Sequence, residues 1–292
     1  MSPAASLRAH RRLSQRQMLY LFQRGVLLLL VALGSVVFIL PFAWMVSTSF
    51  KGSDEVLRFP PVWIPSSLHF DNYVEPWNRL PFATYYKNTL TVVGFNLVGT
   101  LLSSSIVAYG FARLRFRGRN LIFLVLLSTM MLPSQVTLVP TYYLFAKLGW
   151  VNSLKPLIIP VYFGSAFNIF LLRQFAMTIP TELDDAAKMD GCGFLSIYWR
   201  IILPLLRPAL GVIAIFQFTY DWNDFFSPLI YVNSPKHFTV ALGLRTLQST
   251  ILYVPMQHVM AMTLVSIIPV LAVFVVAQRK FIQGIVITGI KG

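Results

Sequence analysis

The chain has 292 residues, of which 56% are hydrophobic and only 12% are charged, and its formal net charge is +14. This composition excludes an ordinary soluble domain and is typical of a polytopic membrane protein. A single cysteine excludes an intrachain disulfide. The Lys and Arg residues stand between apolar segments and form no continuous basic face, so they indicate membrane orientation and no nucleic-acid partner.

The first 87 residues divide into three parts. Residues 1–24 contain five arginines and no acidic residue, which predicts a cytoplasmic N-terminal tail. Residues 25–48 belong to an uncharged run that is longer than the apolar region of about 7–15 residues in a cleavable signal peptide, so they are predicted to be the first transmembrane helix. Residues 49–87 are rich in proline, tryptophan and mixed charges, which predicts an extracytoplasmic loop.

Residues 88–278 are predicted to form a core of five further membrane helices. The uncharged run 88–112 exceeds the roughly 20 residues that a bilayer core requires, and it ends at four arginines within 113–119. The third span is expected from 120 to about Leu138, with Pro133 and Pro140 predicting a break before an outer piece at 142–150. The fourth and sixth spans are expected at 156–172 and 258–278, with an outer loop at 233–257 and a cytoplasmic C-terminal tail at 279–292.

The fifth span is short, because only the residues from Pro208 to Tyr220 separate Arg207 from Asp221. Such a segment covers about 20 Å of a core of roughly 30 Å, so the acidic residues after it are expected at membrane depth, facing a water-filled space. The alternative is an interfacial aromatic belt, and amides within spans also serve as hydrogen bonds between helices. The predicted translocation-pathway residues are Asn168, Gln217, Tyr220, Asp221, Trp222, Asn223 and Asp224.

Six spans place both termini on one side of the membrane. The two tails, the 113–119 turn and the 173–207 segment together contain 16 of the 24 Lys and Arg residues. By the positive-inside rule these four segments are cytoplasmic. The sequence therefore predicts an all-α, multi-pass integral membrane protein with both termini in the cytoplasm.

The cytoplasmic segment from Pro180 to Pro208 is the most unusual part of the chain. It contains four of the ten acidic residues. Thr181 and Asp184 form a capping-box pattern, the carboxylates of the first turn complement the positive end of a helix, and Gly191 is a stop signal. A second helix at 196–203 is expected to lead into the fifth span at Pro204. Without further information, such a helix is either a solvated connector or a docking surface.

The same segment resembles the EAA loop of permease subunits of ATP-binding-cassette (ABC) importers. The family pattern is E-A-A, three residues, G, nine residues and I-x-L-P. Asp185 stands where glutamate is usual, while Ala186, Ala187, Gly191 and the Ile201, Leu203 and Pro204 group match. Weaker matches to the carbohydrate, MalG-like, binding-protein-dependent branch are Asn88-Thr89, Ala108 to Arg113, Trp222 to Phe225, Ala241 to Gly243, Gly284 and Lys291-Gly292.

This resemblance implies a type I ABC importer transmembrane domain: six helices, with a cytoplasmic coupling helix at 181–195 between helices four and five. The coupling helix would sit in a cleft of an ATPase, and spans two to six would be the permease core. The implied partners are a second permease subunit, an ATPase dimer and an extracytoplasmic solute-binding protein. The implied ATPase-coupling residues are Glu182, Asp184, Asp185, Ala186, Ala187, Asp190 and Gly191.

The chain has no P-loop sequence, so no cofactor is expected in it, and ATP and Mg²⁺ are expected on the partner ATPase. The expected cargo is a sugar or related polyol, and the expected location is the plasma (inner) membrane of a prokaryote. An ion-coupled secondary transporter or channel, with Asp221 and Asp224 binding ions, is the alternative. A membrane-embedded enzyme is a third possibility, disfavoured because no carboxylate dyad or histidine cluster lies deep within a span.

Overall fold

A computed structural model describes residues 15–247 and 255–289, and every regular element within these residues is a helix. Four helical stretches are long and apolar enough to cross a membrane, or up to six if each of two bent pairs is counted as one span. The prediction of an all-helical membrane protein is confirmed. The count of six spans agrees with the upper value.

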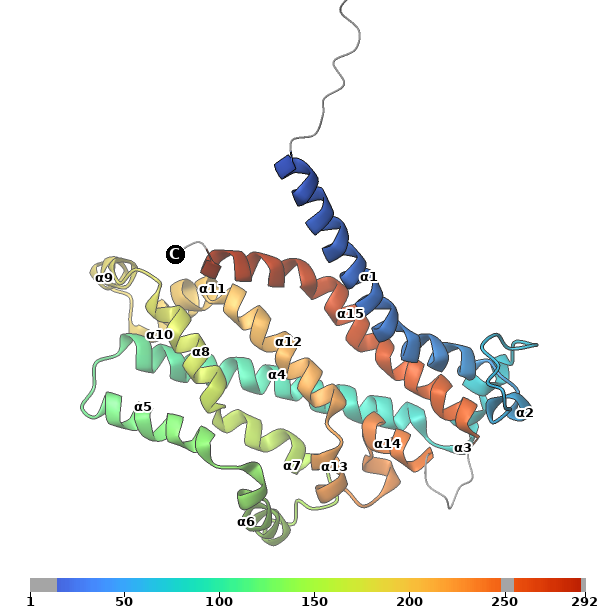
Figure 1. The fold of residues 1–292 in the computed structure, drawn as a ribbon. Coiled ribbons are helices and arrows are strands. Elements are labelled where there is room, and N and C mark those ends of the chain that lie inside the picture. The colour runs from blue at the N-terminus through green and yellow to red at the C-terminus, as the bar shows by residue number, and fades with distance from the viewer. Residues whose placement is uncertain (1–14, 248–254, 290–292) are drawn as a thin grey trace, which may run out of the picture.

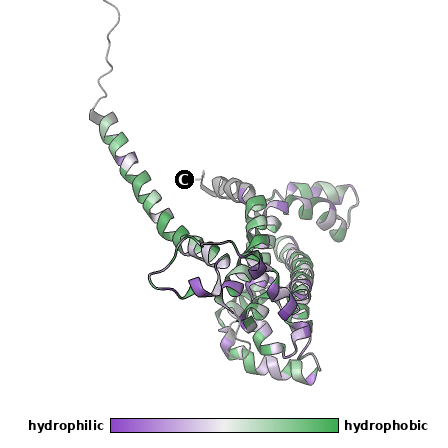
Figure 2. Ribbon diagram, turned by 90° about the vertical axis from the view of Figure 1, so that its right-hand side faces the viewer, coloured by the Kyte–Doolittle hydropathy of each residue, from purple (hydrophilic) through white to green (hydrophobic). Residues whose placement is uncertain are grey.

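Six of the described helices make up the main body of the structure. They pack in the order α1, α15, α12, α4, α8 and α5, so that α4 lies near the centre and α1 at one edge (Figure 1). Most of α1 is hydrophobic along its length and projects beyond the other helices (Figure 2). The bounds of these helices are α1 Gln15–Ser49, α4 Phe82–Arg113, α5 Arg119–Ser128, α8 Ala166–Met177, α12 Arg207–Asn223 and α15 Met256–Gly289.

Shorter elements complete the two ends of the body. On the side predicted to be extracytoplasmic lie α2 Ser53–Val56, η1 Phe70–Tyr73, α3 Glu75–Arg79, α13 Phe226–Tyr231, η5 Pro235–His237 and α14 Val240–Leu247. Between α5 and α8 the chain forms η2 Thr129–Met131, α6 Ser134–Lys147, α7 Lys155–Ile158 and η3 Ile159–Phe163. Between α8 and α12 it forms α9 Glu182–Met189, α10 Phe194–Ile197, η4 Tyr198–Ile202 and α11 Leu203–Leu205.

The outer segment before α14 is tied to the start of α4. The Asn88 side chain donates hydrogen bonds to the carbonyl oxygens of Lys236 and Phe238, each at 2.9 Å, and the Thr89 hydroxyl accepts one from the Val240 amide. Gly243 lies directly on Tyr85, where any Cβ would overlap the ring. Asn88, Thr89 and Gly243, which belong to the two predicted family motifs, therefore hold together the end of the bundle at which α4 begins.

The third span differs from the prediction. The helix ends near Met131, and the chain turns by 100° into α6, which runs through Pro140 to Lys147. Leu132 is extended because the residue before a proline avoids helical geometry, so Pro133 alone makes the break. Pro140 was expected to break the helix as well, but it is accommodated within α6.

The start of the first span and the end of the last span also differ from the expected boundaries. Helix α1 begins at Gln15, so the last ten residues of the expected N-terminal tail are helical. Helix α15 continues to Gly289, beyond the expected boundary at residue 278. Part of the expected outer loop, residues 248–254, and the terminal Lys291-Gly292 lie outside the described residues.

Candidate functional site

Helix α9 carries the acidic sequence and lies at the end of the body where α4 and α15 also end (Figure 1). Its two faces differ sharply. Asp184 and Ala187 are buried against the body, whereas Glu182, Asp185, Ala186 and Asp190 are exposed. Met189 is 88% exposed. The seven predicted ATPase-coupling residues therefore do not form one surface, because two of them face inward.

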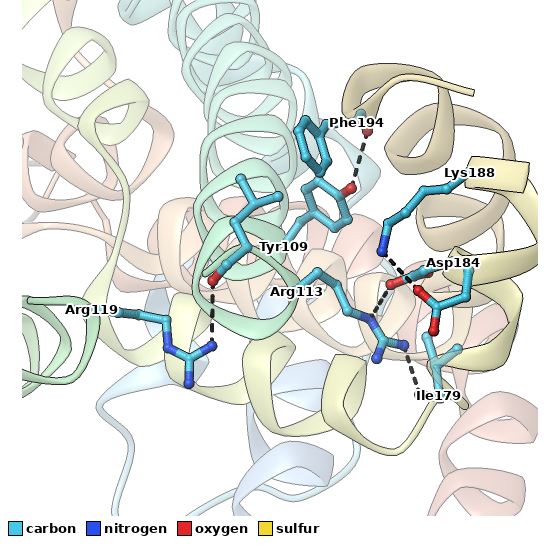
Figure 3. A network of polar contacts seen from close by, with 9 residues as sticks. Tyr109, Arg113, Arg119, Ile179, Asp184, Lys188 and Phe194 are labelled. Atoms are coloured by element: carbon cyan, nitrogen blue, oxygen red, sulfur yellow. Dashed lines mark hydrogen bonds and ion pairs between the residues drawn. The ribbon is translucent and has the colours of Figure 1, made fainter. Parts of the chain in front are cut away.

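A buried ion pair attaches α9 to α4 (Figure 3). Arg113 Nε lies 3.1 Å from Asp184 Oδ2, with side chains that are 5% and 8% exposed. A terminal nitrogen of the same guanidinium donates a 2.7 Å hydrogen bond to the Ile179 carbonyl. Removing one partner of such a pair leaves a buried charge uncompensated, which costs about 3–5 kcal/mol. Arg113 therefore fastens α9 to the C-terminal end of α4.

Two further contacts lie on the same face of α4, one and two turns below Arg113. The Tyr109 hydroxyl donates to the Phe194 carbonyl at 3.1 Å, and the Ser105 and Tyr198 hydroxyls are 2.7 Å apart. Positions 105, 109 and 113 are spaced by four residues, so they form a line along one helix face. We call Ser105, Tyr109 and Arg113 the α4 ladder. It connects α4 to three successive elements, α9, α10 and η4.

The N-terminus of α9 does not carry the predicted capping box. Thr181 has helical backbone angles (φ −74°, ψ −20°), and its side chain makes no capping hydrogen bond. An N-cap residue normally has extended angles that aim its oxygen at the amides of the first turn. The carboxylate of Asp184, which was expected to complete the box, pairs with Arg113 instead. The expectation of three carboxylates in the first turn is confirmed.

The C-terminus of α9 ends as predicted, at a glycine. Gly191 has φ +79°, and its amide donates to the Lys188 carbonyl while the Cys192 amide donates to that of Ala187. These two hydrogen bonds define a Schellman motif, in which glycine is favoured because a left-handed backbone strains other residues. The next helical stretch contains a π-helical turn at η4, a feature that is frequent at functional sites. The stretch from Phe194 to Leu205 then meets α12 at a bend of 74°.

The exposed face of α9 is charged and has an adjacent groove. The Lys188 ammonium donates a 2.9 Å hydrogen bond to Asp185, and this contact lowers the pKa of the Asp185 carboxyl below its usual value. A groove of about 890 Å³ separates α9 from the turn after α4, and Arg115 and Arg119 also line it.

The predicted pathway residues fall into two groups. Asp221 was expected to face a water-filled space, but it is buried and accepts hydrogen bonds from Asn96 of α4 at 3.1 Å and from Gln217 at 2.9 Å. Trp222 is also buried, and its indole donates to the Ser266 carbonyl of α15. These side chains join α12 to its neighbours, because adjacent helices supply the partners that a buried carboxylate and indole require.

The remaining predicted pathway residues are more varied. Tyr220 is 67% exposed, and Asn223 is exposed with its amide bonded to the Thr219 carbonyl. Asp224 accepts a hydrogen bond from the Ser227 amide at the start of α13. Asn168 is buried within α8, which packs on α4. Tyr220 and Asn223 are the predicted pathway residues whose side chains are exposed.

Sequence reasoning did not identify the α4 ladder as part of the site. Arg113 was interpreted only as a topology signal, and Tyr198 was not singled out. Their partners lie far away in the sequence, so no local spacing reveals the contacts. The one available signal was the family-like stretch from Ala108 to Arg113, whose polar members are the ones that contact the acidic segment.

Comparison with known proteins gives consistent matches. Residues 99–286 match the model of a family described as binding-protein-dependent transport system inner membrane component. The chain is 33% identical over 261 residues to the arabinooligosaccharides transport system permease protein AraQ of Halalkalibacterium halodurans, covering 87% of this chain and 91% of that protein. It is 33% identical to the sn-glycerol-3-phosphate transport system permease protein UgpE of Yersinia enterocolitica, covering 80% and 85%.

A solved structure has the same architecture. The crystal structure of a bacterial ABC transporter involved in the import of the acidic polysaccharide alginate matches with a TM-score of 0.79 and 25% identity. The match covers 91% of this chain and 98% of that chain. The similarity therefore extends over most of the chain.

Proposed function

Since this chain belongs to the family of binding-protein-dependent transport system inner membrane components, we propose that it is a permease subunit of an ABC importer for a sugar or related polyol. It forms part of the translocation pathway and performs no ATP chemistry. ATP and Mg²⁺ are held by a separate ATPase subunit. The chain lies in the inner membrane of a prokaryote, with α9 and both termini on the cytoplasmic side.

The observation that carries this proposal is the two-faced character of α9. Its inner face is fastened to α4 through the Arg113–Asp184 pair, and its outer face presents Met189 and acidic side chains to the surroundings. A helix held this firmly transmits a push as rigid-body motion to the helix that holds it. We therefore propose that α9 is the coupling helix, that Glu182, Asp185, Ala186, Met189 and Asp190 contact the ATPase, and that Asp184 and Ala187 hold the helix in place.

The proposed assembly contains four further components: a second permease, two ATPase subunits and an extracytoplasmic solute-binding protein. This chain supplies one coupling helix, α9. Two ATPases that close around ATP each need a coupling helix, so a second permease subunit is proposed to supply the other. The binding protein is supported by the family description. The outer segment between α13 and α15 is the proposed surface for it.

The proposed cargo class is a hydroxyl-rich solute, either neutral or anionic. The relatives include one named for arabinooligosaccharides, which are neutral, and one named for sn-glycerol 3-phosphate, which is anionic. The exposed Tyr220 and Asn223 of α12 offer an aromatic face and an amide, which suit hydroxyl-rich solutes of either charge. We propose these two residues as pathway contacts and assign Asp221 to helix packing.

A charge introduced on the exposed face of α9 tests whether this helix docks on the ATPase. We expect Met189→Asp to remain in the membrane but to lose most of the co-purifying ATPase, because a carboxylate replaces an apolar anchor in a protein interface. Val74→Asp is the control, since Val74 is an exposed apolar residue between η1 and α3, at the opposite end of the helical body from α9. Equal ATPase recovery with both variants would exclude α9 as the docking helix.

A further inference from the structure

The loop that follows α2 exposes an unusual number of apolar side chains. Leu57, Phe59 and Ile64 are 88%, 91% and 83% exposed, and Trp63 is half exposed. All four lie within residues 57–64, together with Arg58 and two prolines. Exposed apolar residues grouped in this way mark a surface that is covered in the working protein. We call residues 57–64 the apolar loop.

Polar contacts hold the apolar loop in place from within. The Ser47 hydroxyl donates to the Trp63 carbonyl, and the Trp63 ring packs edge-on against Trp44 with centroids 4.9 Å apart. The Ser66 amide just beyond the loop donates to the buried Glu55 carboxylate at 3.1 Å. These contacts fix Trp63 on α1 and join the two residues, Glu55 and Ser66, that flank the loop.

These anchors also place the loop with respect to the bilayer. Trp44 and Ser47 belong to the last two turns of α1, within the candidate span Met18–Ser49. A residue packed beside those turns lies at the depth where the span leaves the hydrocarbon. Phe38 and Phe42, which precede these turns in α1, are themselves exposed apolar residues.

From this placement we propose that the apolar loop lies on the outer leaflet, with Phe59 and Ile64 inserted among the lipids and Trp63 at the headgroup level. Aromatic residues concentrate at this level, and the exposed Arg58 is placed to meet lipid phosphates. The loop fixes the outer end of α1 against the membrane surface. This inference goes beyond the transport function and does not depend on the ATPase.

The position of α1 favours lipid over the solute-binding protein as the occupant. Helix α1 lies at the edge of the packing order and packs chiefly on α15. A binding protein that delivers solute must dock over the centre of the assembly, where the pathway opens. A loop attached to a peripheral helix has lipid as its nearest apolar neighbour.

Site-directed fluorescence in the reconstituted complex tests the proposal. The single native Cys192 is replaced by serine, and an environment-sensitive fluorophore is attached to Phe59→Cys or Ile64→Cys. The complex is then placed in phosphatidylcholine and phosphatidylglycerol vesicles. We expect loss of most of the fluorescence with lipids that carry a doxyl quencher near the headgroup and little loss with aqueous iodide. Asn78→Cys, at an exposed position in α3, is the water-facing control and should show the reverse.

Three results would overturn the proposal. Strong quenching by iodide that purified binding protein relieves would assign the loop to that partner. Protection from both quenchers would assign it to the second permease. Strong iodide quenching without any effect of the binding protein would leave the loop in water. The readout requires only membrane insertion, so it stays informative even if the transport assignment fails.

Discussion

The ion pair between Arg113 and Asp184 gives the sharpest prediction. Arg113→Ala leaves Asp184 buried with no cation, which costs about 3–5 kcal/mol, and about 1.4 kcal/mol corresponds to a factor of ten. The equilibrium between attached and detached α9 should therefore shift by about 100-fold or more. Because α9 is the proposed coupling helix, uptake should fall far more than membrane insertion does.

The native cysteine provides an assay for detachment. Cys192 follows α9 directly and packs against the cluster that includes Ala187 and Tyr198. Its rate of reaction with a maleimide should rise in Arg113→Ala, because detachment of α9 uncovers the thiol. Arg79→Ala is the matched control: the Arg79–Glu75 pair also measures 3.1 Å but is about half exposed, and such pairs contribute only about 0–1 kcal/mol.

A double replacement separates charge from shape. Arg113→Met combined with Asp184→Leu removes both charges and keeps apolar volume, so most of the attachment should return, less about 1 kcal/mol for the lost hydrogen bond to Ile179. Unchanged maleimide reactivity and uptake in Arg113→Ala would refute the claim that this pair holds α9. A double variant no better than the single would show that the charges themselves act in transport.

Three further predictions follow from the same contacts. Gly191→Ala should destabilise the C-terminal end of α9 by about 1–2 kcal/mol, because alanine is strained in the left-handed backbone conformation of this position. Gly191→Asn should cost less. The rate at which Cys192 reacts with maleimide measures both effects. Asp221→Leu should lower the thermal unfolding midpoint of the purified complex, because the buried Asn96 amide and the half-buried Gln217 amide each lose a hydrogen bond to the carboxylate, at about 1 kcal/mol each, and an unchanged midpoint would contradict the packing role. Tyr198→Phe should reduce uptake only slightly, since one hydroxyl contact contributes about 1 kcal/mol, and complete loss of uptake would assign that hydroxyl a larger role.

The sequence predicted the parts of the fold that depend on local pattern. The long helices follow from uncharged runs, the break at Pro133 from proline geometry, and the end of α9 from Gly191. Pro140 was misjudged, because whether a helix tolerates a proline depends on how its surroundings satisfy the freed carbonyl. Local pattern also could not show that Thr181 would fail to cap α9.

The parts that were not predicted depend on contacts between distant segments. Asp184 was predicted to cap α9, and the family resemblance implied an ATPase-coupling role for it, but its carboxylate pairs with Arg113 of α4. Asp221 was placed in a water-filled space because its depth in the membrane suggested it, but Asn96 of α4 supplies a partner. In both cases the sequence located the acidic residue in the correct element but did not show that its side chain is buried or which helix supplies its partner.

The source of energy for transport tests the central claim most directly. The chain is purified from membranes with its native associates, reconstituted into vesicles, and supplied with radiolabelled oligosaccharides and sn-glycerol 3-phosphate as probes. We expect an ATPase to co-purify and uptake to stop when ATP is depleted while the ion gradient is maintained. Absence of any ATPase, with uptake that follows the ion gradient and ignores ATP, would contradict the account.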